Sequence, residues 1–372
     1  MSPAGAFPDL TSGRRPVGVV SFAQYDNVRR EGDRNEVEML LPVVGEVFGN
    51  IGITKDDVGF ICSGSTDYLI GGPFSFVAAL DAVGVWPPRA ESHVEMDGAW
   101  ALYEAWVLLQ EGEIDAALVY AFGRSSMGDL SEIMAVQLDP YYLAPLWPDP
   151  TSLAALQAQA MIDRGMASEA DFAAVASRSR KAALSNPKAQ VAYDRSVDEL
   201  LAEDYEVAPL RRHALPPLTD GCAAVVLAAG DKAYEWCERP AFITGIDHRI
   251  ETHSVGARDL TVSPSTRVAG EKAGVGKKGV DVAELHAPFA HQELILTAAL
   301  GLDGGAGDGA GAAVSVNPSG GALAANPMMS AGLIRIGEAA QRIWSGEADR
   351  AVAHATSGPC LQQNLVAVLE GV

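Results

Sequence analysis

The chain contains an internal repeat. Residues 97–123, DGAWALYEAWVLLQEGEIDAALVYAFG, align without gaps with residues 331–357, AGLIRIGEAAQRIWSGEADRAVAHATS. Each copy indicates a helix that opens at a glycine, closes at a Gly-Glu-x-Asp turn and leads into a buried strand. The repeat predicts a duplicated α/β unit whose two helices pack about a pseudo-two-fold axis. Their N-termini would face one shared site, where backbone N–H groups favour anionic ligands.

Apolar β-branched runs alternate with helical patterns along the chain, which predicts α/β layers and a mostly parallel sheet. The predicted strands are 17–23, 58–64, 116–123, 222–230, 241–247, 282–287, 312–317, 350–355 and 364–371. The predicted helices are 34–50, 71–84, 97–111, 152–165, 168–184, 289–300 and 330–345. Residues 124–214 show no strand pattern and indicate a helical insertion. We therefore expect a first half at 1–235, which includes this insertion, and a second half at 236–372.

Charge and hydropathy exclude several classes of partner. The net charge of -21 and the pI near 4.6 argue against nucleic acid or an anionic membrane, because phosphate binding needs a basic face. No stretch reaches the ~18 apolar residues of a membrane span, and the N-terminus lacks the pattern of a secretory signal. We therefore expect a cytoplasmic protein.

The four cysteines are Cys62, Cys222, Cys237 and Cys360. They form no CxxC motif and no cluster with histidine at metal-ligand spacing, so neither a disulfide framework nor a metal site is expected. Reduced thiols in a reducing compartment fit this pattern.

Three segments resemble the motifs of the thiolase superfamily. VNPSGGALAANPMMSAG (316–332) resembles NxxGGxxAxGHPxGAxG, AELHAPFAHQEL (283–294) resembles the HDCF or NEAF segment, and LTDGCAAVVLA (218–228) resembles the SDGAAA strand. RSRKAALSNPKAQ (178–190) is similar to the lipid-transfer and steroid-aldolase branch. The resemblance implies a duplicated thiolase fold, in which two βαβαβ-type halves form five αβαβα layers with a helical loop-domain insertion.

The family's acyl-transfer chemistry uses a nucleophilic cysteine at the start of the first repeat helix, a histidine in GHP and a second cysteine near the C-terminus. In this chain Glu95 stands at the nucleophile position and Asn326 replaces the GHP histidine. Ala355 or Thr356 lies nearest the second cysteine. The resemblance therefore implies no Claisen chemistry through an acyl-enzyme.

The remaining motif residues suggest other roles. His286 matches the histidine of HDCF and can polarise a thioester or move a proton. Asn326 can donate a hydrogen bond to a thioester oxygen or cap its turn. Glu95 and Asp97 open a helix, where they act either as capping carboxylates or as a general base. His291 is expected at the surface or at an interface.

In the family, the insertion covers the nucleotide of coenzyme A. Its basic residues are therefore candidates for the phosphate contacts, namely Arg178, Arg180, Lys181 and Lys188. The turn at Gly320 and Gly321 is a further candidate. The coenzyme A thioester is expected as substrate or ligand, with no covalently bound cofactor.

Two functions of different class remain open. The first is an aldolase that cleaves a β-hydroxyacyl-CoA, including steroid-CoA, together with a small OB-fold, zinc-ribbon partner. The known aldolases of this group carry Tyr where this chain has His286 and Thr356. The second is a non-catalytic subunit that pairs with an active thiolase-like chain. A homodimer is the alternative assembly.

Overall fold

The computed structural model describes residues 7–8, 13–302 and 313–372. Ten strands form one mixed sheet in the order β10-β9-β11-β12-β8-β1-β7-β4-β2-β3. Those of the first half are β1 (Val17–Gln24), β2 (Phe60–Gly64), β3 (Ala90–Val94), β4 (Ala116–Arg124) and β7 (Asp220–Ala229). Those of the second half are β8 (Ala241–Ile250), β9 (Val282–Leu285), β10 (Ser315–Val316), β11 (Arg350–Ser357) and β12 (Gln363–Glu370).

The strand order confirms the duplication that the repeat predicts. The first half runs β3-β2-β4-β7-β1 and the second runs β10-β9-β11-β12-β8, so each strand has a counterpart at the same place. The halves meet where β1 pairs with β8 over Gly18–Val19 and Ala241–Phe242. Within each half the first three strands of that order are parallel and the other pairings are antiparallel. The expectation of a mostly parallel sheet was therefore wrong, because β7 and β12 return against their neighbours.

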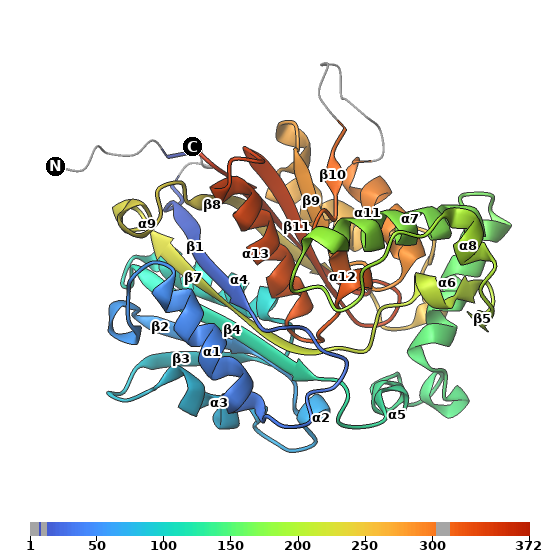
Figure 1. Cartoon of the computed structure of the whole chain (residues 1–372), viewed down its shortest axis with the longest axis horizontal. Helices are drawn as coiled ribbons and strands as arrows, with labels where there is room; N and C mark the ends of the chain where they lie inside the picture. Colours follow the sequence, from blue (N-terminus) through green and yellow to red (C-terminus); the bar gives the residue numbers. More distant parts are fainter. Residues whose placement is uncertain (1–6, 9–12, 303–312) are drawn as a thin grey trace.

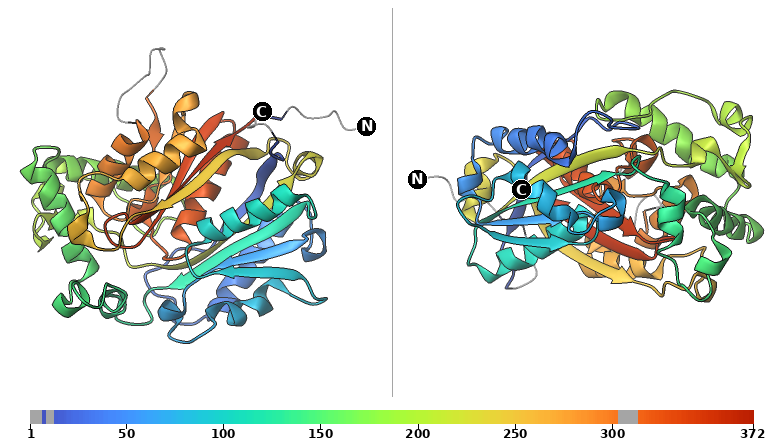
Figure 2. Two further views of the ribbon diagram at one scale, coloured as in Figure 1. Left: turned by 180° about the vertical axis from the view of Figure 1, so that it is seen from behind. Right: turned by 90° about the horizontal axis from the view of Figure 1, so that it is seen from below.

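Helices complete five αβαβα layers, which confirms the expected thiolase architecture (Figures 1 and 2). The two repeat helices, α4 (Gly98–Glu111) and α13 (Ala331–Trp344), contact each other in the middle layer. The other helices of the two halves are α1 (Glu36–Gly49), α2 (Asp67–Ile70), α3 (Ser75–Val83), α9 (Asp231–Trp236), α10 (Pro264–Ala273), α11 (Ala290–Leu300) and α12 (Gly321–Ala324). Buried side chains of both halves, among them Leu102, Leu109, Leu333 and Ile336, form the central core.

The segment between β4 and β7 forms a lobe at one end of the molecule, coloured green in Figures 1 and 2. Its helices are α5 (Leu130–Ala135), α6 (Pro150–Asp163), α7 (Glu169–Ala182) and α8 (Val197–Leu201). It also contains a two-stranded sheet, β5 (Tyr205–Val207) and β6 (Leu210–Arg211). The prediction that this segment has no strand was therefore wrong, because strands of two or three residues leave no readable alternation.

Other differences concern short or polar elements. The predicted helix 71–84 begins later than expected, at Ser75, as α3, and the separate single turn α2 ends at Ile70 before it. The edge strand β3 has the sequence AESHV. Because its central residues are polar, a search for apolar runs does not find it. β10 is shorter than the predicted 312–317, whose first residue lies outside the described residues. None of the helices in the described ranges combines the length and the hydropathy that crossing a membrane would require.

Candidate functional site

A cavity of about 380 Å³ lies where the two halves and the insertion meet. It is lined by segments that follow the parallel strands β2, β3, β9 and β11, the edge of a sheet at which ligands commonly bind. Its polar lining includes Tyr68, Asp97, His286, Asn326 and Thr356. Its apolar wall comes mainly from the insertion and from the loop before α13, namely Leu130, Met134, Leu138, Pro148, Leu153, Met328 and Met329.

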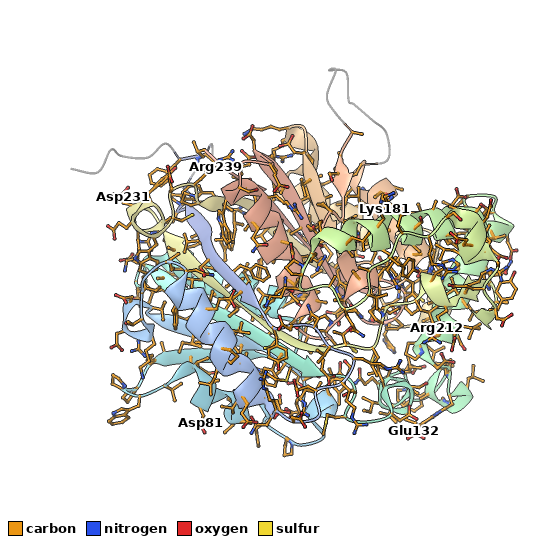
Figure 3. The ribbon with its side chains drawn as sticks, in the orientation of Figure 1. Asp81, Glu132, Lys181, Arg212, Asp231 and Arg239 are labelled. Atoms are coloured by element: carbon orange, nitrogen blue, oxygen red, sulfur yellow. The ribbon has the colours of Figure 1, made fainter. Side chains whose placement is uncertain are left out.

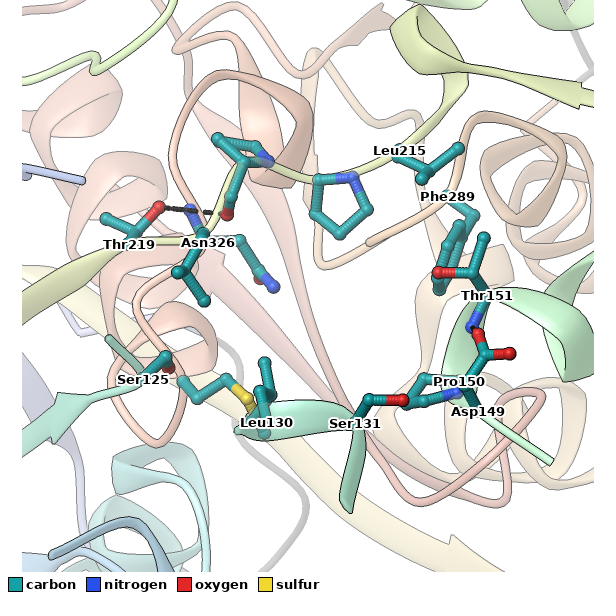
Figure 4. Close-up of a pocket in the computed structure, with 14 residues that line it drawn as sticks. Ser125, Leu130, Ser131, Asp149, Pro150, Thr151, Leu215, Thr219, Phe289 and Asn326 are labelled. Carbon is teal, nitrogen blue, oxygen red and sulfur yellow. Dashed lines mark hydrogen bonds between the residues drawn. The ribbon is translucent and has the colours of Figure 1, made fainter. Parts of the chain in front are cut away.

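A second hollow of about 210 Å³ adjoins this cavity. Figure 4 shows it with Thr219 and Asn326 on one side and Asp149 and Thr151 on the other. It shares Leu130, Pro150, Phe289, Asn326 and Met328 with the cavity lining. The two hollows therefore adjoin each other, Asn326 lines both, and we refer to them together as the channel.

His286 and Asn326 form the polar centre of the cavity. The Nε2 atom of His286 lies 2.9 Å from Asn326 Oδ1, and the Thr356 N–H donates to His286 Nδ1 at 3.4 Å. Because Nδ1 accepts a hydrogen bond, the neutral ring carries its proton on Nε2 and donates it to Asn326. Burial lowers the pKa of His286 to about 4, which the hydrogen bond to Asn326 opposes and the charge of Arg335 reinforces. His286 is therefore neutral at physiological pH, with both ring nitrogens engaged.

This pairing fixes the amide of Asn326. Its Oδ1 accepts from His286 and its backbone N–H donates to Thr219 Oγ1 at 3.1 Å. Among the described residues, its Nδ2 group has no hydrogen-bond partner, and the side chain lines both hollows. Asn326 therefore presents N–H donors to a ligand.

The loop that carries Asn326 is held by a buried polar network. Arg335 on α13 forms a salt bridge with Glu284 on β9 at 2.8 Å, and both side chains are almost fully buried. Glu284 also accepts from the backbone N–H and the hydroxyl of Ser319, at 3.0 and 2.7 Å. Asn317, with a φ of 51°, accepts from the Leu285 N–H. The network fixes the loop on the strand that ends just before His286.

Asp97 caps both repeat helices. Its Oδ1 accepts from Ala99 N on α4 at 2.8 Å and from Leu333 N on α13 at 3.1 Å, and its Oδ2 accepts from Gly332 N at 2.8 Å. Burial raises the pKa of Asp97 to about 6, against the lowering effect of these three hydrogen bonds. A side chain at Gly332 would meet Asp97 Oδ1 at 2.5 Å, so the position requires glycine. The helix N-termini that the repeat predicts at a shared site are thus occupied by an internal carboxylate.

Glu95 lies outside the cavity lining. Its Oε1 accepts from the Asp67 N–H at 2.7 Å, and its Oε2 lies 3.1 Å from His93 Nε2. The side chain is half exposed. Glu95 therefore contacts the start of α2, and the structure does not bring it together with His286 and Asn326.

The four basic candidates for the phosphate contacts lie in different environments. Arg178 pairs with the buried Glu293, Lys181 pairs with Asp194 at 2.9 Å, and Lys188 pairs with Asp26 at 2.7 Å. Each of these carboxylates neutralises its base. Arg180 lines a cavity together with three other arginines. Figure 3 shows Lys181 well away from Arg212, which lines the same cavity as Arg180.

The cavity at Arg180 measures about 640 Å³ and is rich in arginine, with Arg29, Arg195 and Arg212 in its lining. Arg180 is only 6% exposed, and its Nε atom has no hydrogen-bond partner. Burial lowers the pKa of its guanidinium. The nearby carboxylate of Glu203 forms a salt bridge with Arg195 and lies 3.0 Å from His213 Nδ1. The segment 215–218 lines both this cavity and the channel.

The two glycine candidates have a packing role in the structure. Gly320 has a φ of 95°, and a side chain there would meet the Cβ atoms of Ala183 and Ala324 at 2.7 Å. The Ser179 hydroxyl donates to its carbonyl. Gly321 has a φ of 59° and lies against Asn317. These residues let the loop pack against α7, and neither lines the cavities described above.

Sequence reasoning did not find Tyr68, which follows β2 and lines the main cavity. It also placed His291 at the surface, which was wrong, because the ring is fully buried and lies 3.1 Å from Gln157 Oε1. Cys360 is buried and lines the cavity, where burial raises the pKa of its thiol to about 11. The described residues include no group of three His, Cys, Asp or Glu side chains suited to a metal ion.

Comparisons with known proteins agree with this geometry. Residues 248–370 match the family described as thiolase C-terminal domain-like. The chain is 29% identical over 265 residues to acetyl-CoA acetyltransferase of Methanocaldococcus jannaschii, covering 65% of this chain and 67% of that protein. It is 26% identical over 268 residues to sterol carrier protein 2 of Bos taurus, covering 63% of this chain and about half, 49%, of that protein.

Solved structures show the same fold. One described as an Ltp2-ChsH2(DUF35) aldolase has a TM-score of 0.78 at 19% identity and covers 96% of this chain and 98% of that chain. Human mitochondrial 3-ketoacyl-CoA thiolase in complex with CoA has a TM-score of 0.75 at 16% identity and covers 96% and 98%. The fold is that of a thiolase. The match over residues 248–370 and the similarity to these relatives make the chain thiolase-like.

Proposed function

We propose that the chain binds an acyl-CoA and cleaves a carbon–carbon bond of a β-hydroxyacyl-CoA by retro-aldol chemistry, alone or as a subunit. The observation that carries this proposal is the His286–Asn326 pair. It holds a neutral amide with its N–H donors toward the cavity, as the oxygen of a thioester enolate requires. Catalysis of this kind stabilises the enolate more than the substrate.

Thiolytic or Claisen chemistry fits the site poorly. An acyl-enzyme needs an activated thiol, and such thiols have a lowered pKa. The thiol that lines the cavity is Cys360, whose pKa burial raises to about 11 and whose Sγ lies 3.5 Å from the Leu153 carbonyl oxygen. Glu95 replaces a thiol at the start of α4.

Asp97 is the cavity-lining carboxylate and the base in this proposal. With a pKa of about 6 it is ionised at neutral pH, and its Oδ2 atom accepts only one of the three N–H bonds. It takes the proton of the β-hydroxyl as the Cα–Cβ bond breaks. The bond's electron pair forms the thioester enolate, whose oxygen Asn326 binds, while the β-carbon leaves as a carbonyl. A proton added at Cα then gives the shortened acyl-CoA.

The phosphates of CoA would bind in the arginine cavity. Arg180 is a buried cation whose Nε is free, and the cavity adjoins the channel along residues 215–218. Arg29 and Arg212 add charge that matches a phosphate group, whereas Arg195 is paired with Glu203. The pantetheine arm would follow the channel to Asn326.

A steroid-type acyl group and a small OB-fold, zinc-ribbon partner are part of this proposal. Its support is the structural neighbour described as an Ltp2-ChsH2(DUF35) aldolase and the similarity to sterol carrier protein 2. The second candidate is a non-catalytic subunit that completes the pocket of another thiolase-like chain. Two properties of His286 favour this second candidate: both ring nitrogens are engaged in hydrogen bonds, and its pKa is lowered to about 4.

The test is release of a carbonyl product from a steroid-type β-hydroxyacyl-CoA, with and without the small partner. We expect Asn326→Ala and His286→Ala each to lower turnover ~100-fold while the fold is retained. The exposed His253 supplies a matched control, since His253→Ala should leave turnover unchanged. Equal turnover in all variants would refute the role of the pair. Absence of turnover in every sample would favour the non-catalytic subunit.

A further inference from the structure

The carboxylate of Glu95 organises the turn that carries Tyr68. Its Oε1 accepts the Asp67 N–H at the first position of α2. Asp67 in turn accepts from Ser75 N at 2.8 Å and from Phe74 N at 3.0 Å, which joins α2 to the start of α3. Tyr68 belongs to the single turn of α2 and lines the cavity. A four-residue helix is not stable by itself, so these hydrogen bonds define where the phenol lies.

Tyr68 has the properties of a proton donor. The other titratable groups in the described lining have different properties: both nitrogens of His286 are engaged, the Cys360 thiol is un-ionised, and Asp97 is the base of the proposed cleavage. Burial raises the pKa of Tyr68, which Thr66 and Gln137 oppose and the charge of Glu95 reinforces. The phenol therefore keeps its proton at neutral pH.

We propose that Tyr68 is the acid that protonates Cα of the thioester enolate, and that Glu95 is the residue that positions it. This inference rests on the retro-aldol function proposed above. The β-hydroxyl proton passes to Asp97 as the Cα–Cβ bond breaks, and the Tyr68 O–H then gives its proton to Cα. Asp97 returns its proton to the phenolate through water. Atoms and charge balance without a further reactant.

Exchange of the α-hydrogens of an acyl-CoA in D₂O isolates this step. Tyr68 passes its proton through water to Asp97, the phenolate takes the α-proton to form the enolate, and the O–D group then returns deuterium to Cα without cleaving a carbon–carbon bond. Propionyl-CoA is the probe, and deuterium uptake is followed by mass spectrometry. We expect Tyr68→Phe to slow both exchange and cleavage ~100-fold, as for loss of a general acid. Tyr205→Phe, at an exposed tyrosine on β5, is the matched control and should exchange at the wild-type rate.

Glu95→Gln separates positioning from simple folding. Because the charge of Glu95 raises the pKa of Tyr68, its removal should move the alkaline limb of the exchange rate to lower pH. A purely structural contact would lower the rate without moving that limb, which would overturn the role given to Glu95. If Tyr68→Phe exchanges at the wild-type rate and the wild type still cleaves its substrate, the role of Tyr68 is overturned. The lyase proposal then still stands. Wild-type protein that neither cleaves nor exchanges would instead remove the proposed function itself.

Discussion

Replacing Asp97 with alanine should destabilise the protein more than loss of an ordinary helix cap. The substitution leaves one N–H of α4 and two of α13 without their acceptor, inside the layer where the halves meet. Buried donors without partners cost ~1–3 kcal/mol each. Removing the carboxylate also removes the free-energy cost of its buried charge. The rise of its pKa from 3.8 to about 6 corresponds to a cost of about 3 kcal/mol at neutral pH. Three donors give a loss of ~3–9 kcal/mol, and subtracting about 3 kcal/mol leaves an expected net loss of ~0–6 kcal/mol, ~3 kcal/mol at its midpoint.

Urea unfolding followed by circular dichroism measures this loss, with Asp129→Ala as control. Asp129 caps α5 alone, at an exposed position, so its removal should cost about 1 kcal/mol. The folded-state pKa of Asp97 lies above its unfolded value, so wild-type stability from this group is complete below about pH 4 and declines as pH rises through about 6. The difference between wild type and Asp97→Ala should therefore shrink from pH 4 to pH 7. A loss no larger than the control's would refute the joint cap.

Three further outcomes follow from the same geometry. Arg335→Met should lower the free energy of unfolding in urea by ~3–5 kcal/mol, because it leaves Glu284 buried without its counter-ion. Adding Glu284→Gln should recover much of this loss, and a single variant as stable as the wild type would contradict the prediction. Incubation with radiolabelled acetyl-CoA should give no covalent acyl-enzyme, since burial raises the pKa of the Cys360 thiol to about 11; label retained after denaturation would show otherwise. Turnover should rise as pH increases through about 6, where Asp97 ionises, and a flat profile from pH 5 to pH 7 would exclude Asp97 as the base.

The repeat made the fold predictable. Two copies of one helix-strand unit required two equivalent half-sheets, and the strand order has that symmetry. The elements missed in the sequence lack the signal that reveals strands and helices: β3 is a polar edge strand, and α2 is a single turn. Their positions depend on contacts with distant residues, such as the pairing of β3 with β2 and the bond from Asp67 to Glu95.

The site was predictable only where a motif named its residues. His286 and Asn326 were both selected from motifs, but their hydrogen bond joins residues 40 positions apart and needed the structure. Ion pairing decides which basic candidates are available to a ligand. Lys181 has an ion-pair partner of its own, whereas Arg180 is buried beside an arginine cavity. Sequence composition cannot distinguish these two cases, because both side chains lie on one helix.

The division of groups between the halves bears on the kind of reaction the site can perform. The second half supplies Asn326 and His286, which are neutral near pH 7 and act as hydrogen-bond donors. The first half supplies the groups that can carry a proton, Asp97 after β3 and Tyr68 after β2. An asparagine at position 326 cannot accept a proton, so any base must face the ligand from the first half. Such an arrangement suits a reaction that binds an oxyanion at one end and moves a proton at the other, as retro-aldol cleavage does.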